Sequence, residues 1–147
     1  MIKLIIGNKG SGKTKTMIRM ANEAVETSKG YVVCVEKGLK LTYDLKNSVR
    51  LIDTEEYDIT GYDCFYAFLS GILAGNYDIT EVFVDSILKI GGRDLTALEK
   101  LLFKIDAKFK DTEFVFTVSA DYSEIPGRLT TELSCLFAHL YPFLLNG

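Results

Sequence analysis

The stretch Gly7-Asn8-Lys9-Gly10-Ser11-Gly12-Lys13-Thr14 decides how the rest of this 147-residue chain is interpreted. It matches the pattern G-x-x-x-x-G-K-[S/T], with an apolar segment before it and a helix-like segment after it. Its glycines allow backbone conformations that are closed to residues with a Cβ atom, so backbone amides can surround an anion. A helix that begins near Lys13 adds unpaired N–H groups and the positive end of its dipole. The stretch therefore predicts a phosphate-binding loop between a strand and a helix.

The side chains of this loop indicate a triphosphate site that includes a metal ion. We expect Lys13, exposed on the loop when no nucleotide is bound, to reach the β- and γ-phosphates and the Thr14 hydroxyl to bind Mg²⁺. The alternative is a glycine-rich turn that binds no ligand. The nucleotide-binding residues that we predict are Gly7, Asn8, Lys9, Gly10, Ser11, Gly12, Lys13, Thr14 and Lys15.

The composition is that of a globular protein, and the length suits a single domain over residues 1–147. Hydrophobic residues make up 48% of the chain and charged residues 25%, which excludes a disordered chain. No apolar run approaches the length that crosses a bilayer, and the first residues do not have the layout of a signal peptide. We therefore expect a cytoplasmic protein without a membrane segment. Cys34, Cys64 and Cys135 are widely spaced in apolar surroundings, and we expect reduced core residues.

The charge is distributed unevenly along the chain. Residues 1–50 carry ten Lys and Arg against four Asp and Glu, whereas residues 51–147 carry seven against sixteen. A basic segment around the phosphate loop suits an anionic ligand, and the acidic remainder argues against broad binding of nucleic acid. The alternative is a pair of solvated faces with no partner.

Apolar runs and helical spacing alternate in a way that predicts an α/β fold. We expect a three-layer α/β/α sandwich with a mostly parallel central sheet. Residues 49–52 could add a short strand. The segment from 126 to 142 keeps a helical period, with a strand near 135–141 as the alternative. The predicted strands are residues 3–6, 31–35, 81–85 and 113–118, and the predicted helices are residues 13–27, 62–74 and 94–110.

Two polar residues stand where predicted strands end. Asp85 closes an apolar strand, and because parallel strands end at one edge of a sheet, we expect it beside Thr14 in the Mg²⁺ site. Ser119 ends the next strand, where its hydroxyl could contact the γ-phosphate or orient a water molecule. Strand-end aspartates are also common as turn residues, which is the alternative for Asp85, and Ser119 could equally be a turn residue. The predicted catalytic residues are Lys13, Asp85 and Ser119, and the predicted metal ligands are Thr14 and Asp85.

At residues 7–14 and at Asp85, the chain resembles P-loop NTPases that carry both Walker motifs. A strand at 31–35 between the phosphate-loop strand and the Asp85 strand, with a polar strand exit at Ser119, resembles the additional-strand division of that class. This division includes RecA-like ATPases and thymidine-kinase-like enzymes. The resemblance implies the P-loop NTPase fold, ATP as the nucleotide and Mg²⁺ as its metal.

The chain departs from this family in several ways. Members that hydrolyse ATP generally have a glutamate directly after the strand-end aspartate, and this chain has Ser86 there. A base would have to lie elsewhere, with Glu36 and Asp121 as candidates. The guanine motif N-K-x-D, a C-terminal zinc-binding segment and a lid with paired arginines are missing. Arg93 and Arg128 are candidates for an arginine finger.

These observations lead to three functional hypotheses. The first is a protein that binds MgATP and hydrolyses it slowly. The second is a nucleotide-dependent interaction module, in which ATP orders the loop after Asp85 and this loop binds a protein partner or a second copy of the chain. The third is a small-molecule kinase with its acceptor pocket at residues 38–78 and 91–93. His139 is expected to be a packing residue.

Overall fold

The computed structural model describes residues 1–137, which form an α/β fold around a six-stranded sheet. All strand pairs are parallel, and the strand order is β3-β2-β4-β5-β1-β6. The strands are β1 (Ile2–Gly7), β2 (Tyr31–Glu36), β3 (Val49–Asp53), β4 (Ile79–Val84), β5 (Glu113–Ser119) and β6 (Ser134–Phe137). The helices are α1 (Lys13–Thr27), α2 (Tyr62–Gly75), α3 (Ile87–Gly91), α4 (Leu95–Lys108) and α5 (Gly127–Glu132), with 3-10 turns at Glu55–Tyr57 and Tyr122–Glu124.

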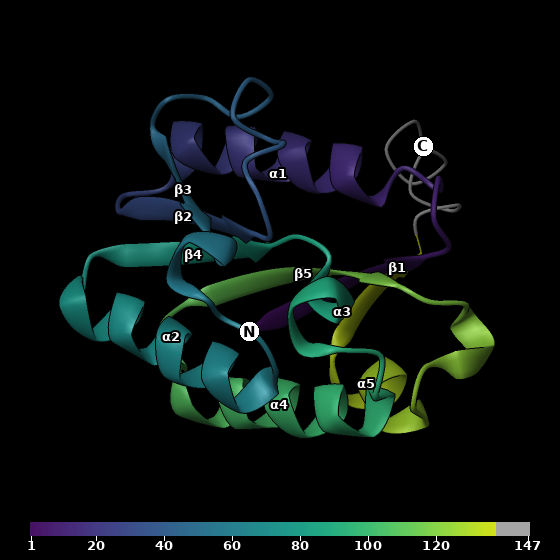
Figure 1. Ribbon diagram of the computed structural model, residues 1–147. Coiled ribbons are helices and arrows are strands. Elements are labelled where there is room, and N and C mark those ends of the chain that lie inside the picture. The colour runs from purple at the N-terminus through teal and green to yellow at the C-terminus, as the bar shows by residue number, and fades with distance from the viewer. Residues whose placement is uncertain (138–147) are drawn as a thin grey trace.

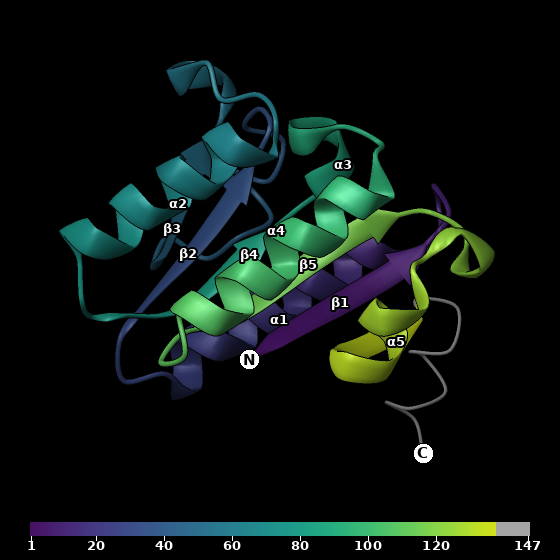
Figure 2. The same cartoon turned by 90° about the horizontal axis from the view of Figure 1, so that it is seen from below.

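Helices lie on both faces of the sheet. Figure 1 shows α1 on one face and α2, α4 and α5 on the other. In Figure 2 these three helices lie on the near face, with α1 behind the sheet. The arrangement is compatible with the expected three-layer α/β/α sandwich, and the expected short strand at 49–52 is present as β3.

The core is divided by the sheet into two parts, because successive side chains of a strand point to opposite faces. On β1, Ile5 packs with Met17 and Ala21 of α1, whereas Leu4 belongs to the larger cluster beneath α2 and α4. Both β1 side chains are fully buried. This explains why β1 is almost uninterrupted in its apolar character, as a parallel strand covered on both faces must be.

The order of the strands corrects one expectation. The strand between β1 and β4 is β5, whereas β2, the predicted strand at 31–35, lies on the far side of β4. After β1 the chain crosses the sheet by way of α1 to reach β2, which leaves room for β4 and then β5 to enter between them. Three strand ends therefore converge at the phosphate loop, those of β1, β5 and β4.

The C-terminal part of the described chain corrects a second expectation. The predicted helix from 126 to 142 ends at Glu132, and β6 then pairs in parallel with β1, with Leu4 opposite Cys135. The unpaired edge of β1 needs a hydrogen-bonding neighbour, and this long-range pairing overrides the helical spacing. The alternative strand near 135–141 overlaps β6 at 135–137. Its remainder, including His139, lies outside the described residues.

The positions of the cysteines agree only in part with the expectation that all three lie in the core. Cys34 is buried and Cys135 is half-buried, but Cys64 is exposed, so its predicted place in the core was wrong. It lies on the outer side of α2, because Phe65 and Leu69 of the same helix turn inward. All three are free thiols, and no cluster of His, Cys, Asp or Glu within residues 1–137 could hold a metal ion. Nor does this part of the chain contain a helix with the length and apolar character needed to span a bilayer.

Candidate functional site

The carboxyl ends of three neighbouring strands bring the candidate residues together. The phosphate loop follows β1, Asp85 follows β4, and Ser119 is the last residue of β5, opposite Gly7 in the register. The Thr14 hydroxyl donates to Oδ1 of Asp85 at 3.1 Å, across 71 residues of sequence. A hydroxyl and a carboxylate of the kind that Mg²⁺ prefers thus lie in direct contact.

The phosphate loop has the backbone that its glycines predict. Gly10 and Gly12 have φ angles of 83° and 89°, in the left-handed region that favours glycine. The Ser11 amide donates to the Asn8 carbonyl at 3.1 Å and closes the turn. In the described part of the chain, the amides of Lys9, Gly10 and Gly12 donate to no protein acceptor. These amides are free to bind an anion.

Lys13 is buried, in contrast to the exposed position that a loop lysine suggests. Its side chain folds back over the loop, where Nζ donates to the Asn8 carbonyl at 3.0 Å, and the residue is only 6% exposed. Burial lowers the pKa of its ammonium group, the charge of Asp85 raises it, and the charge of Lys89 lowers it. The ammonium therefore lies close to both the aspartate and a second cation.

Asp85 is held by a residue that the sequence analysis missed. The carboxylate is 8% exposed, and its Oδ1 also accepts a hydrogen bond of 2.7 Å from the Thr117 hydroxyl. Thr117 is fully buried on β5, and the same hydroxyl accepts the Ser86 amide at 2.6 Å. The available signal was a hydroxyl inside an otherwise apolar strand, two residues before Ser119 and on the same face.

A cavity of about 510 Å³ opens at this junction of the phosphate loop, the segment after β4 and the end of β5. Among the lining residues from the described part of the chain, four are cations and none is a carboxylate. The Ser119 carbonyl at its wall accepts a hydrogen bond of 3.3 Å from Nη2 of Arg93. The lining residues are Asn8, Lys9, Gly10, Lys13, Thr14, Ser86, Leu88, Lys89, Arg93 and Ser119.

Other predicted site residues lie around this cavity but do not line it. Gly7 and Ser11 line a smaller hollow of about 260 Å³ on another side of the loop. The Ser11 hydroxyl oxygen is buried there and has no hydrogen-bond partner among the described residues. Lys15 is exposed on the first turn of α1.

The two candidate bases do not line the main cavity. Glu36 is 3% exposed at the end of β2, where Oε2 accepts the Leu41 amide at 2.9 Å and closes the following loop. Burial is the main reason that the pKa of Glu36 is raised. Asp121 is exposed beside the smaller hollow, where it accepts hydrogen bonds from Asn8 and Ser123. The bonds from Ser123 are the largest contribution to its lowered pKa.

The two candidates for an arginine finger differ in their distance from the main cavity, because Arg93 lines it and Arg128 does not. Arg93 lines the main cavity, whereas Arg128 on α5 forms ion pairs with Glu99 and Glu132 and lies over the ring of Phe103. Arg128 does not line that cavity.

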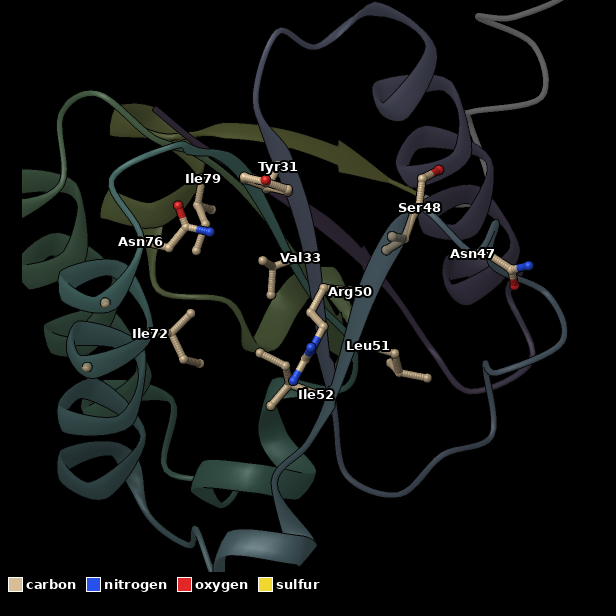
Figure 3. A pocket seen from close by; sticks show the side chains of 13 residues that line it. Tyr31, Val33, Asn47, Ser48, Arg50, Leu51, Ile52, Ile72, Asn76 and Ile79 are labelled. Carbon is tan, nitrogen blue, oxygen red and sulfur yellow. The ribbon is translucent and has the colours of Figure 1, made fainter.

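A larger hollow of about 600 Å³ lies elsewhere, between β2, β3 and α2 (Figure 3). Figure 3 shows Val33, Ile52, Ile72 and Ile79 around it, together with Arg50 of β3. It shares no lining residue with the cavity at the phosphate loop. Its size therefore does not make it the candidate for phosphate chemistry.

No protein-family model matches this chain, and no curated protein matches its sequence.

Proposed function

We propose that the protein binds MgATP in the cavity at the phosphate loop, on a P-loop NTPase fold, and hydrolyses it slowly. One observation carries the proposal: free loop amides and four cations surround a cavity whose edge holds the Thr14–Asp85 contact. A site that concentrates positive charge without a carboxylate in its lining suits a polyphosphate.

The chain's own groups supply distinct parts of such a site. The loop amides and the first turn of α1, which includes Lys15, would bind phosphate oxygens. Lys13 would exchange the neutral Asn8 carbonyl for an anionic phosphate oxygen, which is a stronger, charge-assisted bond. Thr14 and Asp85 would hold Mg²⁺, which neutralises phosphate charge when it is bound. Ser119 would face the terminal phosphate from the end of β5.

The strand order supports the additional-strand division as the nearest resemblance. In that interpretation β5 is the inserted strand between the phosphate-loop strand and the Asp85 strand. The order places Ser119 between the phosphate loop and Asp85 at the same edge of the sheet.

Slow turnover follows from the lack of a base in position. Ser86 follows Asp85, the Glu36 carboxylate is engaged by a loop amide, and Asp121 lies at another hollow. Residues 1–137 place no carboxylate in the lining of the main cavity, so they can position and stabilise phosphates but supply no group there to take a proton from water. The same observation favours the nucleotide-dependent interaction module as a second candidate. The larger hollow gives the kinase hypothesis no support, since it lies apart from the phosphate loop.

The test is a titration of the protein with ATP, ADP and GTP, with and without Mg²⁺. Lys13→Ala should weaken MgATP binding by more than about tenfold, through loss of a charge-assisted contact. Because Lys13 is buried, thermal unfolding of the variant is measured alongside, and Lys29→Ala, an exposed lysine at the other end of α1, is the matched control. Asp85→Asn should chiefly reduce the Mg²⁺-dependent part of the affinity. A folded Lys13→Ala variant that binds MgATP as tightly as the parent would show that the assignment is wrong.

Steady-state assays then separate the three activities. Phosphate release from ATP alone indicates an ATPase, ADP formation that requires an acceptor indicates a kinase, and tight binding with negligible turnover indicates the module.

A further inference from the structure

The segment of residues 86–93 joins Asp85 to α4 and forms one wall of the phosphate-loop cavity. Its beginning is fixed by the Ser86 amide, which donates to the Thr117 hydroxyl at 2.6 Å. Ser86 has a φ of 55°, a left-handed conformation that is uncommon for residues other than glycine. This turn sets the direction in which α3 leaves the metal-binding edge of the sheet.

The end of the segment is fixed by the start of α2. The Gly61 amide donates to the Ile90 carbonyl at 3.0 Å, and the Tyr62 hydroxyl donates to the Gly92 carbonyl. Gly91 fits flat against the Tyr62 ring, since a Cβ atom added at Gly91 would lie 2.1 Å from Cε1 of Tyr62. Tyr62 thus contacts the segment in two ways: its hydroxyl bonds to the backbone at Gly92, and its ring packs against Gly91.

Between these anchors, the segment presents two cations to the cavity. Ile87, Leu88 and Ile90 are buried and fix the orientation of α3, which leaves Lys89 and Arg93 at the cavity lining. Within residues 1–137, the Lys89 side chain forms no ion pair or hydrogen bond, and the Arg93 side chain donates only to the neutral Ser119 carbonyl at 3.3 Å.

This placement gathers like charges around one cavity, with the carboxylate of Asp85 at its edge. Lys13 and Lys89 both line this cavity. Lys9 adds a further cation to the same lining. A bound polyanion would relieve this repulsion, and it would do so most where the segment faces the cavity.

We propose that Lys89 and Arg93 form a subsite that contacts the terminal phosphate of a nucleoside triphosphate, and that Tyr62 is the positioning residue for this subsite. The proposal rests on the proposed function and adds to it how the site distinguishes ATP from ADP. Arg93 would leave the Ser119 carbonyl for a phosphate oxygen, a charge-assisted bond in place of a neutral one. Without nucleotide, the Ser119 carbonyl would keep its hydrogen bond to Arg93 and so hold the arginine beside the cavity.

The test compares the affinities for ATP and ADP, both with Mg²⁺, in single variants of the intact chain. Arg93→Ala and Lys89→Ala should each weaken ATP binding by about tenfold, the low end for a charged hydrogen bond because both side chains are exposed, and ADP binding by less than about threefold. Arg128→Ala and Lys100→Ala are the matched controls, an exposed arginine and an exposed lysine outside the cavity, and both should leave the ratio unchanged.

Tyr62→Phe tests the positioning role with the ring kept in place. The loss of its hydroxyl bond to Gly92 should weaken ATP binding by about threefold without an effect on ADP. Combined with Arg93→Ala, it should cause little further loss, because Tyr62 acts through the cation that the double variant lacks. A merely structural tyrosine would instead lower the affinity for both nucleotides.

The outcomes distinguish a failure of the proposed subsite from a failure of the proposed nucleotide binding. A parent protein that binds ATP, with variants that lose affinity for ATP and ADP equally or for neither, overturns the subsite and leaves the proposed function standing. A parent protein that binds neither nucleotide overturns the proposed function and the subsite with it. A selective loss of ATP affinity in both cation variants, with unchanged controls, supports the subsite.

Discussion

Thr117→Val is the substitution that best isolates how Asp85 is held. Valine has nearly the shape of threonine and is the more apolar residue, so simple burial predicts that it is tolerated in a fully buried position. The hydrogen bonds predict the opposite. The Thr117 hydroxyl donates to the Asp85 carboxylate at 2.7 Å and accepts the Ser86 amide at 2.6 Å, and valine removes both bonds at once.

The expected loss of stability follows from these two hydrogen bonds. A hydrogen bond to a charged group contributes about 1.5–3 kcal/mol, and a buried amide left without a partner costs about 1–3 kcal/mol. The additional buried methyl group of valine returns roughly 0.8 kcal/mol. Allowing for relaxation around Ser86, we expect Thr117→Val to lower the free energy of unfolding by about 2–4 kcal/mol.

Urea unfolding at pH 7 measures this difference, and Thr117→Ser supplies the control. Serine keeps both hydrogen bonds and loses one methyl group, at a cost of about 1 kcal/mol. The expected order of stability is therefore parent, Thr117→Ser, Thr117→Val, with equal dependence on urea concentration. If Thr117→Val were as stable as the parent, or more stable than Thr117→Ser, the hydroxyl would not hold the Asp85 site together and this account would be refuted.

Two further predictions concern a charged pair within the sheet and the packing of a glycine beside it. Burial and the charge of Glu113, its neighbour across β4 and β5, raise the pKa of Glu81 above 4.5, so its ionised form is disfavoured in the folded state. Glu81→Gln should therefore raise the free energy of unfolding in urea at pH 7 by on the order of 0.5 kcal/mol, and the gain should vanish below about pH 4; a gain that is independent of pH would contradict this. A Cβ atom added to Gly30 would lie 2.2 Å from the Asp78 carbonyl oxygen, so Gly30→Ala should lower the stability in thermal unfolding by about 2 kcal/mol. Gly71→Ala, in open space on α2, should instead raise it by up to about 1 kcal/mol, and equal effects of the two substitutions would refute the steric argument.

The features that the sequence predicted well are those set by local chemistry. The glycine spacing of the phosphate loop, the buried strands and the start of the helix at 94–110 each depend on a few neighbouring residues. Asp94 indeed begins α4, and its carboxylate accepts the amides of Thr96 and Ala97. Asp85 could be placed near Thr14 because parallel strands share an edge, which is a rule of topology and needs no knowledge of packing.

The features that the sequence did not predict depend on contacts between distant segments. Around residues 129–137, the apolar residues are compatible with a helix as well as with a strand. The structure forms β6 there because this segment pairs with the edge of β1. Lys13 seemed an exposed loop residue because its acceptor, the Asn8 carbonyl, exists only once the loop has folded. Thr117 can hold Asp85 because β5 lies beside β4, and this strand order could not be predicted from the sequence.

The two anchors of segment 86–93 give the interaction-module hypothesis a mechanical basis. Thr117 joins the start of the segment to Asp85, and Tyr62 joins its end to α2. Because Gly91 leaves no space against the Tyr62 ring, the segment cannot shift far without moving the start of α2. A phosphate that draws Arg93 away from Ser119 would thus act on α2, on the face of the sheet opposite α1. Packed interfaces in general shift between discrete arrangements, and so the proposed nucleotide site, even with slow turnover, would still report which nucleotide it holds.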